Sequence, residues 1–186
     1  MRQDPPRIPP VDPQTATPEQ QKLLDGWWRN MNFARVMAQH PKLYAYFVPL
    51  IRKVIPETEL PPRDRQILVL RTLALCDETY EATHHAHISH HAGLTDADIE
   101  AARTGSPSLS PFERTLVKAA DELVRFHRVS DDTWSSLAGR YSQVQLMEVV
   151  GLVGTYTMLA MIMRSYGVQL EDAEGLEALQ ALRTYT

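Results

Sequence analysis

The chain has 186 residues, of which 44% are hydrophobic and 23% are charged. This length and composition suffice for a globular domain with a hydrophobic core. The formal net charge of −4 offers no basic surface to nucleic acid or to a membrane, so we expect neither as a partner. The single cysteine, Cys76, excludes an intramolecular disulfide, and the first residues lack the apolar core of a signal peptide. Both features favour a cytoplasmic location.

Two regions differ in composition. Residues 1–18 contain six of the thirteen prolines, which predicts an extended N-terminal arm. Residues 19–186 are predicted to form one helical domain, because helical periodicity and capping residues recur there without a sustained strand-like alternation. The fold class expected is therefore all-α, a single-domain helical bundle. The predicted helices cover approximately residues 18–28, 33–38, 41–55, 63–75, 77–92, 96–104, 111–127, 131–141, 142–166 and 171–185.

The most apolar stretch is residues 149–163, which is short for a membrane span and is bounded by Glu148 and Arg164. A helix that is apolar on nearly all sides lies either in the centre of a core or against another subunit. We expect a buried helix of a soluble protein here.

Five of the seven histidines lie in one eight-residue window on the helix predicted over 77–92. Histidine exchanges protons near neutral pH, so such a cluster is a candidate for chemistry. At about 100° per residue, one stripe of this helix holds Tyr80, His84, His87 and His91. The adjacent stripe, which mixes polar and apolar residues and is expected to face inward, holds Glu81, His85, Ile88 and Ala92. His90 and His91 are expected to be solvated.

Glu81 and His85 are four residues apart, so their side chains can touch on one face of the helix. A half-buried Glu–His pair keeps one imidazole nitrogen protonated and leaves the other as an acceptor, which prepares a general base. We predict such an acid/base pair. The alternative is a buried hydrogen-bonded pair that only stabilises the helix or an oligomer contact.

Two neighbours, Tyr80 and His84, could donate a hydrogen bond to a substrate oxygen. The spacings among His84, His87 and His91 would also suit zinc or nickel, but no distant ligand motif accompanies them. No native metal is therefore predicted, and a metal-dependent hydrolase stays an alternative.

Four further residues are predicted to contact a substrate. Arginine can clamp a carboxylate, although such an arginine often pairs with an acid of the protein instead. Tryptophan and tyrosine can form the wall of a binding site. The candidates are Arg65, Arg71, Trp28 and Tyr156.

Several ordered stretches carry a resemblance to a known family. They are PRDRQILVLR at 62–71, YEATHH at 80–85 and AGLTDADIE at 92–100, followed by LSPFER at 109–114 and MEVVGLVGTYTM at 147–158. The chain resembles the carboxymuconolactone decarboxylase-like family over approximately residues 30–170. This resemblance implies an all-helical fold of the alkylhydroperoxidase D-like type. It also implies homo-oligomers whose sites lie near or between subunits.

The family includes a cofactor-free decarboxylase of a carboxylated lactone from aromatic catabolism and a thiol peroxidase, alkylhydroperoxidase D. The peroxidase branch has a Cys-x-x-Cys pair, a histidine four residues later and an upstream glutamate as proton relay. In this chain the cysteine positions fall at Glu78 and Glu81, the histidine at His85 and the relay near Gln66. A carboxylate cannot form a disulfide or a sulfenic acid, so the thiol mechanism lacks its residues.

The sequence thus predicts a homo-oligomer (dimer, trimer or hexamer) that acts on a small carboxylated or lactone metabolite without a cofactor. In this interpretation His85 is the acid or base, Glu81 orients it, and His84 or Tyr80 binds the enolate oxygen. The reaction class is a lyase or isomerase. The alternatives are a peroxidase, a metal-dependent hydrolase and a non-catalytic ligand-binding oligomer.

Overall fold

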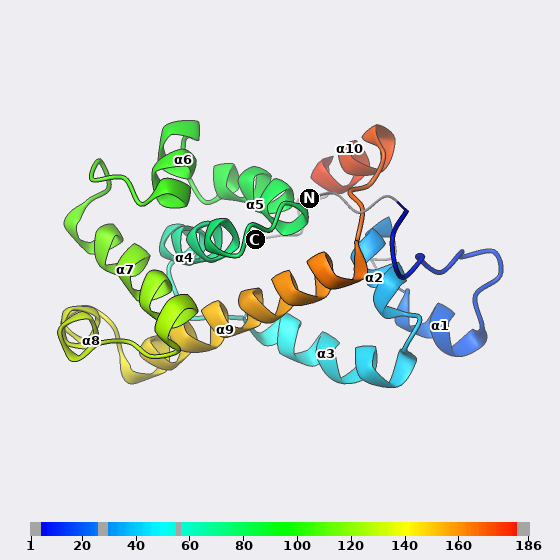
Figure 1. Ribbon diagram of the computed structural model, residues 1–186, viewed down its shortest axis with the longest axis horizontal. Coiled ribbons are helices and arrows are strands. Elements are labelled where there is room, and N and C mark those ends of the chain that lie inside the picture. The colour runs from blue at the N-terminus through cyan, green and yellow to red at the C-terminus, as the bar shows by residue number, and fades with distance from the viewer. Residues whose placement is uncertain (1–4, 26–29, 55–56, 182–186) are drawn as a thin grey trace. The chain divides into compact units, whose positions relative to one another are not determined.

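The protein is described by a computed structural model that covers residues 5–25, 30–54 and 57–181 (Figure 1). Within these ranges the regular structure is helical throughout and contains no strand, which confirms the predicted all-α class. The ten helices are α1 (Pro18–Leu23), α2 (Asn32–Met37), α3 (Pro41–Val54), α4 (Pro62–Leu75), α5 (Tyr80–His91), α6 (Asp96–Thr104), α7 (Pro111–Phe126), α8 (Asp131–Ala138), α9 (Gln143–Tyr166) and α10 (Ala173–Ala181).

The described residues form two compact units. One unit combines residues 5–25 and 30–53 with 162–181, and the other contains residues 54 and 57–161. The proline-rich arm belongs to the first unit and is hydrogen-bonded into it. The backbone N–H of Val11 donates to the carbonyl of Arg35 at 3.0 Å, and Arg35 Nε donates back to the carbonyl of Val11 at 2.8 Å.

Several helix boundaries differ from the predictions, and two of them concern the predicted site. The first helix ends at Leu23, and Trp28, which was predicted to extend it and to contact a substrate, lies outside the described residues. The helix predicted from residue 77 begins at Tyr80, because Asp77 adopts a left-handed backbone conformation with φ of 51°. A residue with that backbone cannot form part of a right-handed helix.

The core of the second unit is built around α4, which packs against α5, α6 and α7 (Figure 1). The helix is buried on nearly all sides. Ile67, Leu68 and Leu73 are each fully buried. Its central position explains why residues 67–70 are apolar without a break, so that this part of the helix has no polar face.

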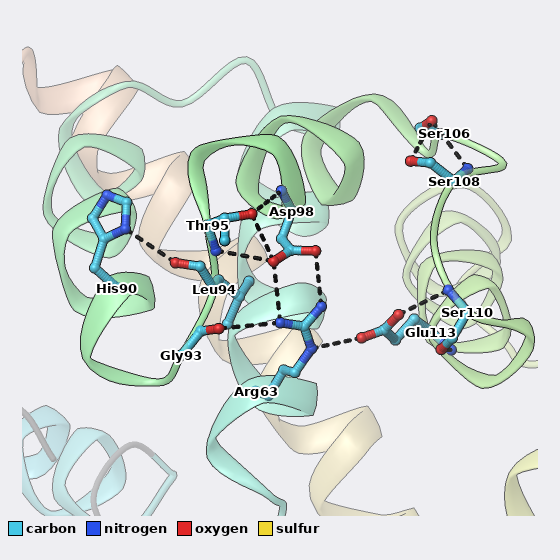
Figure 2. A network of polar contacts seen from close by, with 10 residues as sticks. All are labelled: Arg63, His90, Gly93, Leu94, Thr95, Asp98, Ser106, Ser108, Ser110 and Glu113. Atoms are coloured by element: carbon cyan, nitrogen blue, oxygen red, sulfur yellow. Dashed lines mark hydrogen bonds and ion pairs between the residues drawn. The ribbon is translucent and has the colours of Figure 1, made fainter.

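One arginine joins the start of α4 to the starts of two other helices (Figure 2). Thr95 and Asp98 form the capping box of α6, and Ser110 and Glu113 form that of α7, as the sequence of each predicts. Arg63 binds both capping acids, with Nη2 3.0 Å from Asp98 Oδ1 and Nε 2.7 Å from Glu113 Oε1. The hydrogen bond from Arg63 lowers the pKa of the Asp98 carboxyl. We call these three residues the Arg63 clamp.

Among the described residues, α9 is the one helix long and apolar enough to cross a membrane by length and composition. Half of its most apolar stretch is buried inside the protein.

Candidate acid/base site around His85

A buried carboxylate starts the helix that carries the histidines. Glu78 accepts hydrogen bonds from the backbone N–H groups of Tyr80 at 2.7 Å and Glu81 at 2.8 Å. These groups have no partner within the first turn of a helix, so the carboxylate replaces a conventional cap. Burial raises the pKa of Glu78, and the backbone hydrogen bonds partly oppose this. The sequence indicated no such role for Glu78.

The inward stripe of α5 is as predicted. Glu81, His85 and Ile88 are buried, whereas His90 and His91 are exposed. The C-terminal end of the helix therefore faces solvent, while its first two turns face the core of the second unit.

The imidazole of His85 is held by side chains from two other helices. Its Nδ1 lies 2.8 Å from Oε1 of Gln66 on α4, and its Nε2 lies 2.7 Å from the hydroxyl of Tyr156 on α9. An amide oxygen can only accept, so Nδ1 carries the proton and donates it to Gln66. Nε2 is then the acceptor, and the hydroxyl of Tyr156 donates to it. This chain of hydrogen bonds fixes one tautomer of His85.

Glu81 contacts His85 differently from the prediction. Its Oε2 lies 3.8 Å from Nε2, which is beyond hydrogen-bonding distance but within reach of a charge interaction. The spacing of four residues brings the two side chains together. Glu81 lies on the Nε2 side of the ring, whereas Nδ1 of His85 faces Gln66 on α4. Gln66 therefore binds the ring nitrogen that faces away from Glu81, and the role of Glu81 as the orienting residue stays a prediction.

Gln66 was missed as a site residue, although a signal was present. It is an amide directly before the apolar run Ile67–Leu70, and the alignment with the family placed the relay position near it. The side chain is 1% exposed, and Ser89 Oγ also lies 3.4 Å from its Oε1.

The electrostatics keep both His85 and Tyr156 neutral. Burial, followed by the charges of His84 and Arg65, lowers the pKa of His85 to about 3. Burial and the negative charge of Glu81 raise the pKa of Tyr156 well above its ordinary value, against a smaller opposing effect of Arg65. Near neutral pH the pair is therefore an uncharged phenol donating to an uncharged imidazole.

The two predicted arginines have separate environments. Arg65 is buried beside Gln66 on α4, and its charge acts on both His85 and Tyr156. Arg71 instead pairs with Asp121, with Nη2 2.7 Å from Oδ1, and its Nη1 donates to the carbonyl of Arg103 at 2.7 Å. Arg71 thus has the structural role that the sequence left open.

The remaining aromatic and histidine candidates form two pairs. Tyr80 and His84 are buried and pack edge to face, with ring centroids 4.9 Å apart. His87 and His91 form a similar pair at 4.9 Å nearer the end of α5. In the described ranges, no three His, Cys, Asp or Glu side chains are arranged to hold one metal ion.

Comparison with known protein families gives a match over part of the chain. Residues 41–122, which include Gln66, Glu81 and His85, match the sequence profile of the carboxymuconolactone decarboxylase family. No curated protein shows significant sequence similarity to the chain.

Solved structures of similar fold are distant in sequence. An alkylhydroperoxidase AhpD core, an uncharacterized peroxidase-related protein from Ralstonia eutropha, superposes with a TM-score of 0.77 at 14% identity over 94% of this chain and 96% of that chain. A peroxidase-related protein from Silicibacter gives 0.76 at 14% identity over 92% and 94%. A variant of the debrominase Bmp8 in complex with 2,3,4-tribromopyrrole gives 0.73 at 18% identity over 92% and 96%. These likenesses establish an alkylhydroperoxidase D-like fold.

Proposed function

We propose that the chain is a member of the carboxymuconolactone decarboxylase family, whose model matches residues 41–122, and that it is a cofactor-free cytoplasmic enzyme. Its substrate would be a small carboxylated or lactone-like metabolite, and its reaction a decarboxylation or a related lyase or isomerase step. The observation that supports this most directly is the neutral His85, whose acceptor nitrogen lies beside a phenol at 2.7 Å and a carboxylate at 3.8 Å.

Decarboxylation sets clear requirements for the groups in the site. The bond between the ring carbon and the carboxylate breaks, carbon dioxide leaves, and the electron pair is delocalised onto the lactone carbonyl as an enolate. A hydrogen-bond donor stabilises the enolate oxygen, and a proton is then delivered to carbon. The protein needs a neutral donor and a proton carrier, but no redox group.

His85 and Tyr156 suit these two roles. The hydroxyl of Tyr156 stays protonated because its pKa is raised, so it can donate to an enolate oxygen in place of His85. Nε2 of His85 can take up a proton from water and deliver it to the enolate carbon, and the negative charge of Glu81 at 3.8 Å would stabilise the imidazolium. Gln66 acts as a positioning residue, and the charge of Arg65 favours an anionic substrate.

The predicted enolate partners Tyr80 and His84 are less suited to this role, because their rings pack against each other. They remain candidates for substrate contact. Tyr156 is the donor that the geometry favours.

The test is a decarboxylation assay on the untagged protein with a panel of carboxylated γ-lactones. The quantity measured is the release of carbon dioxide. We expect turnover by the wild type, a loss of kcat of at least about 100-fold in His85→Ala, and a smaller loss in Glu81→Gln. His90→Ala changes an exposed histidine outside the site and is the matched control. Gln66→Leu should shift the pH dependence of kcat more than it changes KM.

A purely structural hydrogen-bonded cluster would give a different result. His85→Ala and Gln66→Leu would then lower the free energy of unfolding, while no panel compound would be turned over by any variant. That outcome would refute the enzyme proposal and leave a ligand-binding oligomer.

A peroxidase of the same fold is the second candidate, favoured by the peroxidase-related structures. The single cysteine, Cys76, cannot form an intramolecular disulfide, so turnover would have to proceed through one thiol and an external reductant. Peroxide consumption with a dithiol that disappears in Cys76→Ser would establish this function instead. Activity of wild type and Cys76→Ser alike on a lactone would exclude it.

A further inference from the structure

One face of α9 carries exposed apolar side chains. Val144, Met147 and Met161 are 48%, 66% and 63% exposed, and Met158 between them is half-buried. All of these residues belong to the second unit. Solvated methionine and valine side chains at this density on one helix are typical of an interaction surface.

The exposed residues follow a heptad spacing. The stripe consists of Val144, Met147, Gly151, Gly154, Met158 and Met161, whose separations alternate between three and four residues. This is the spacing by which one helix presents a seam to another helix. We call these six residues the α9 stripe.

The spacing of the α9 stripe is the same in both directions, and its residue types match except at the two ends, where Val144 stands opposite Met161. Its two glycines lie in the centre, Met147 and Met158 flank them symmetrically, and Val144 and Met161 end the stripe at equal distances. Two copies of the helix that run antiparallel and cross at the glycines would pair Met147 of each with Met158 of the other. A twofold interface requires such self-complementarity.

The central glycines have no explanation within a single chain. Both are exposed, and a Cβ added at Gly151 or Gly154 would meet nothing within 4 Å. Glycine is unfavourable in an exposed helix interior, so alanine would be the better residue for the isolated chain. A second helix explains both glycines, since small residues let two helix backbones approach closely.

Charge also favours a second copy as the occupant. No position of the α9 stripe is charged, so two copies meet without like-charge repulsion. The antiparallel arrangement brings the positive end of each helix dipole toward the negative end of the other. A helix that binds a membrane surface would carry Lys or Arg beside its apolar face, and none occurs between Val144 and Met161.

We propose that two copies of this chain associate through the α9 stripe, antiparallel and crossing at Gly151 and Gly154. The proposal does not depend on the catalytic role of His85. It assigns the two faces of α9 to different tasks, since the buried face carries Tyr156, which binds His85, and the exposed face binds the partner.

The first test is the mass of the untagged full-length protein by sedimentation velocity over a range of concentrations. Wild type should sediment as a dimer or a multiple of it, and Gly154→Leu should halve that mass with an unchanged circular dichroism spectrum. The new side chain enters open space in the single chain, so loss of folding is not expected. Phe126→Glu, which changes an exposed residue outside the stripe, is the control that should keep the wild-type mass.

The second test is specific for the register. Met147→Lys and Met158→Glu should each weaken association at least tenfold, and their combination in one chain should restore it, because each lysine then faces a glutamate. The combination of Met147→Lys with Met161→Glu should not restore association.

The proposal is overturned if wild type is monomeric at every concentration or if Gly154→Leu keeps the wild-type mass. It is also overturned if the matched pair fails to restore association. Binding to anionic phosphatidylglycerol vesicles that is lost in Gly154→Leu would identify a membrane as the occupant instead.

Discussion

At the residue scale, His85 shows how burial decides the protonation of a group that the sequence can only place on a helix. Its neutral ring is kept in one tautomer by Gln66 on one side and Tyr156 on the other. Protonation would place a charge in the core beside Arg65, whose own charge already opposes it. The resting state therefore holds an acceptor nitrogen at Nε2.

This environment predicts an acid-sensitive contribution to stability. The pKa of His85 is about 3 in the folded protein against an ordinary value of 6.5, so at lower pH the unfolded chain binds a proton that the native state does not. The contribution is complete above pH 6.5 and is lost as the pH falls toward 3, at up to about 1.4 kcal/mol per pH unit.

The measurement is urea denaturation at a series of pH values. His85→Gln removes the titrating ring, so the slope of its unfolding free energy over this pH range should be shallower than that of wild type. Equal slopes in the two proteins would show that His85 titrates normally in the folded state.

At the element scale, the residues that begin the helices can be recognised in the sequence. The contacts that join one helix to another cannot be recognised there. The capping boxes of α6 and α7 need only residues three apart along the chain. Arg63 comes from α4 and binds the acid of each box, which ties three helix starts together (Figure 2).

Removal of the Arg63 clamp should destabilise the second unit. Arg63→Met is expected to lower the free energy of unfolding by about 1–2 kcal/mol, because three hydrogen bonds to the carboxylates of Asp98 and Glu113 are lost while partial exposure weakens each of them. Arg63→Lys keeps the charge but not the forked geometry, so its loss should be intermediate. Urea denaturation at low and high salt measures both.

An exposed ion pair provides the matched control. Arg103 lies 3.1 Å from Glu100 within α6, and both side chains are about half exposed or more. Arg103→Met should therefore cost about 0.5 kcal/mol or less. If Arg63→Met costs no more than this control, the clamp contributes nothing beyond an ordinary surface pair.

At the scale of the whole molecule, association through the α9 stripe would couple stability to concentration. An oligomer that dissociates on unfolding is stabilised by mass action, so its Tm rises with protein concentration. A tenfold increase should raise the Tm of a wild-type dimer by about 1–3 °C. Calorimetry of wild type beside Gly154→Leu measures this effect. The variant should show no dependence on concentration, and a wild-type Tm that is equally insensitive would argue against the interface.

Much of the fold could be predicted from the sequence alone because its signals are local. Helix periodicity, the capping acids of α6 and α7, and the inward stripe of α5 depend on residues within a turn or two of each other. The spacing of Glu81 and His85 belongs to the same class and correctly indicated that their side chains meet. The resemblance to a family could also be recognised, because the matched stretches are long and ordered along the chain.

The tertiary structure alone decided which partners these residues have. Gln66, His85 and Tyr156 are separated by many residues, and their hydrogen bonds depend on how α4, α5 and α9 pack. The same packing places Arg71 in an ion pair with Asp121. It also places Gln66, and not Glu81, beside Nδ1 of His85. The sequence by itself determined that a histidine and a carboxylate share one face of a helix. The direction of each ring nitrogen and the pKa of the ring depend on burial among distant residues, so only the packed chain could determine them.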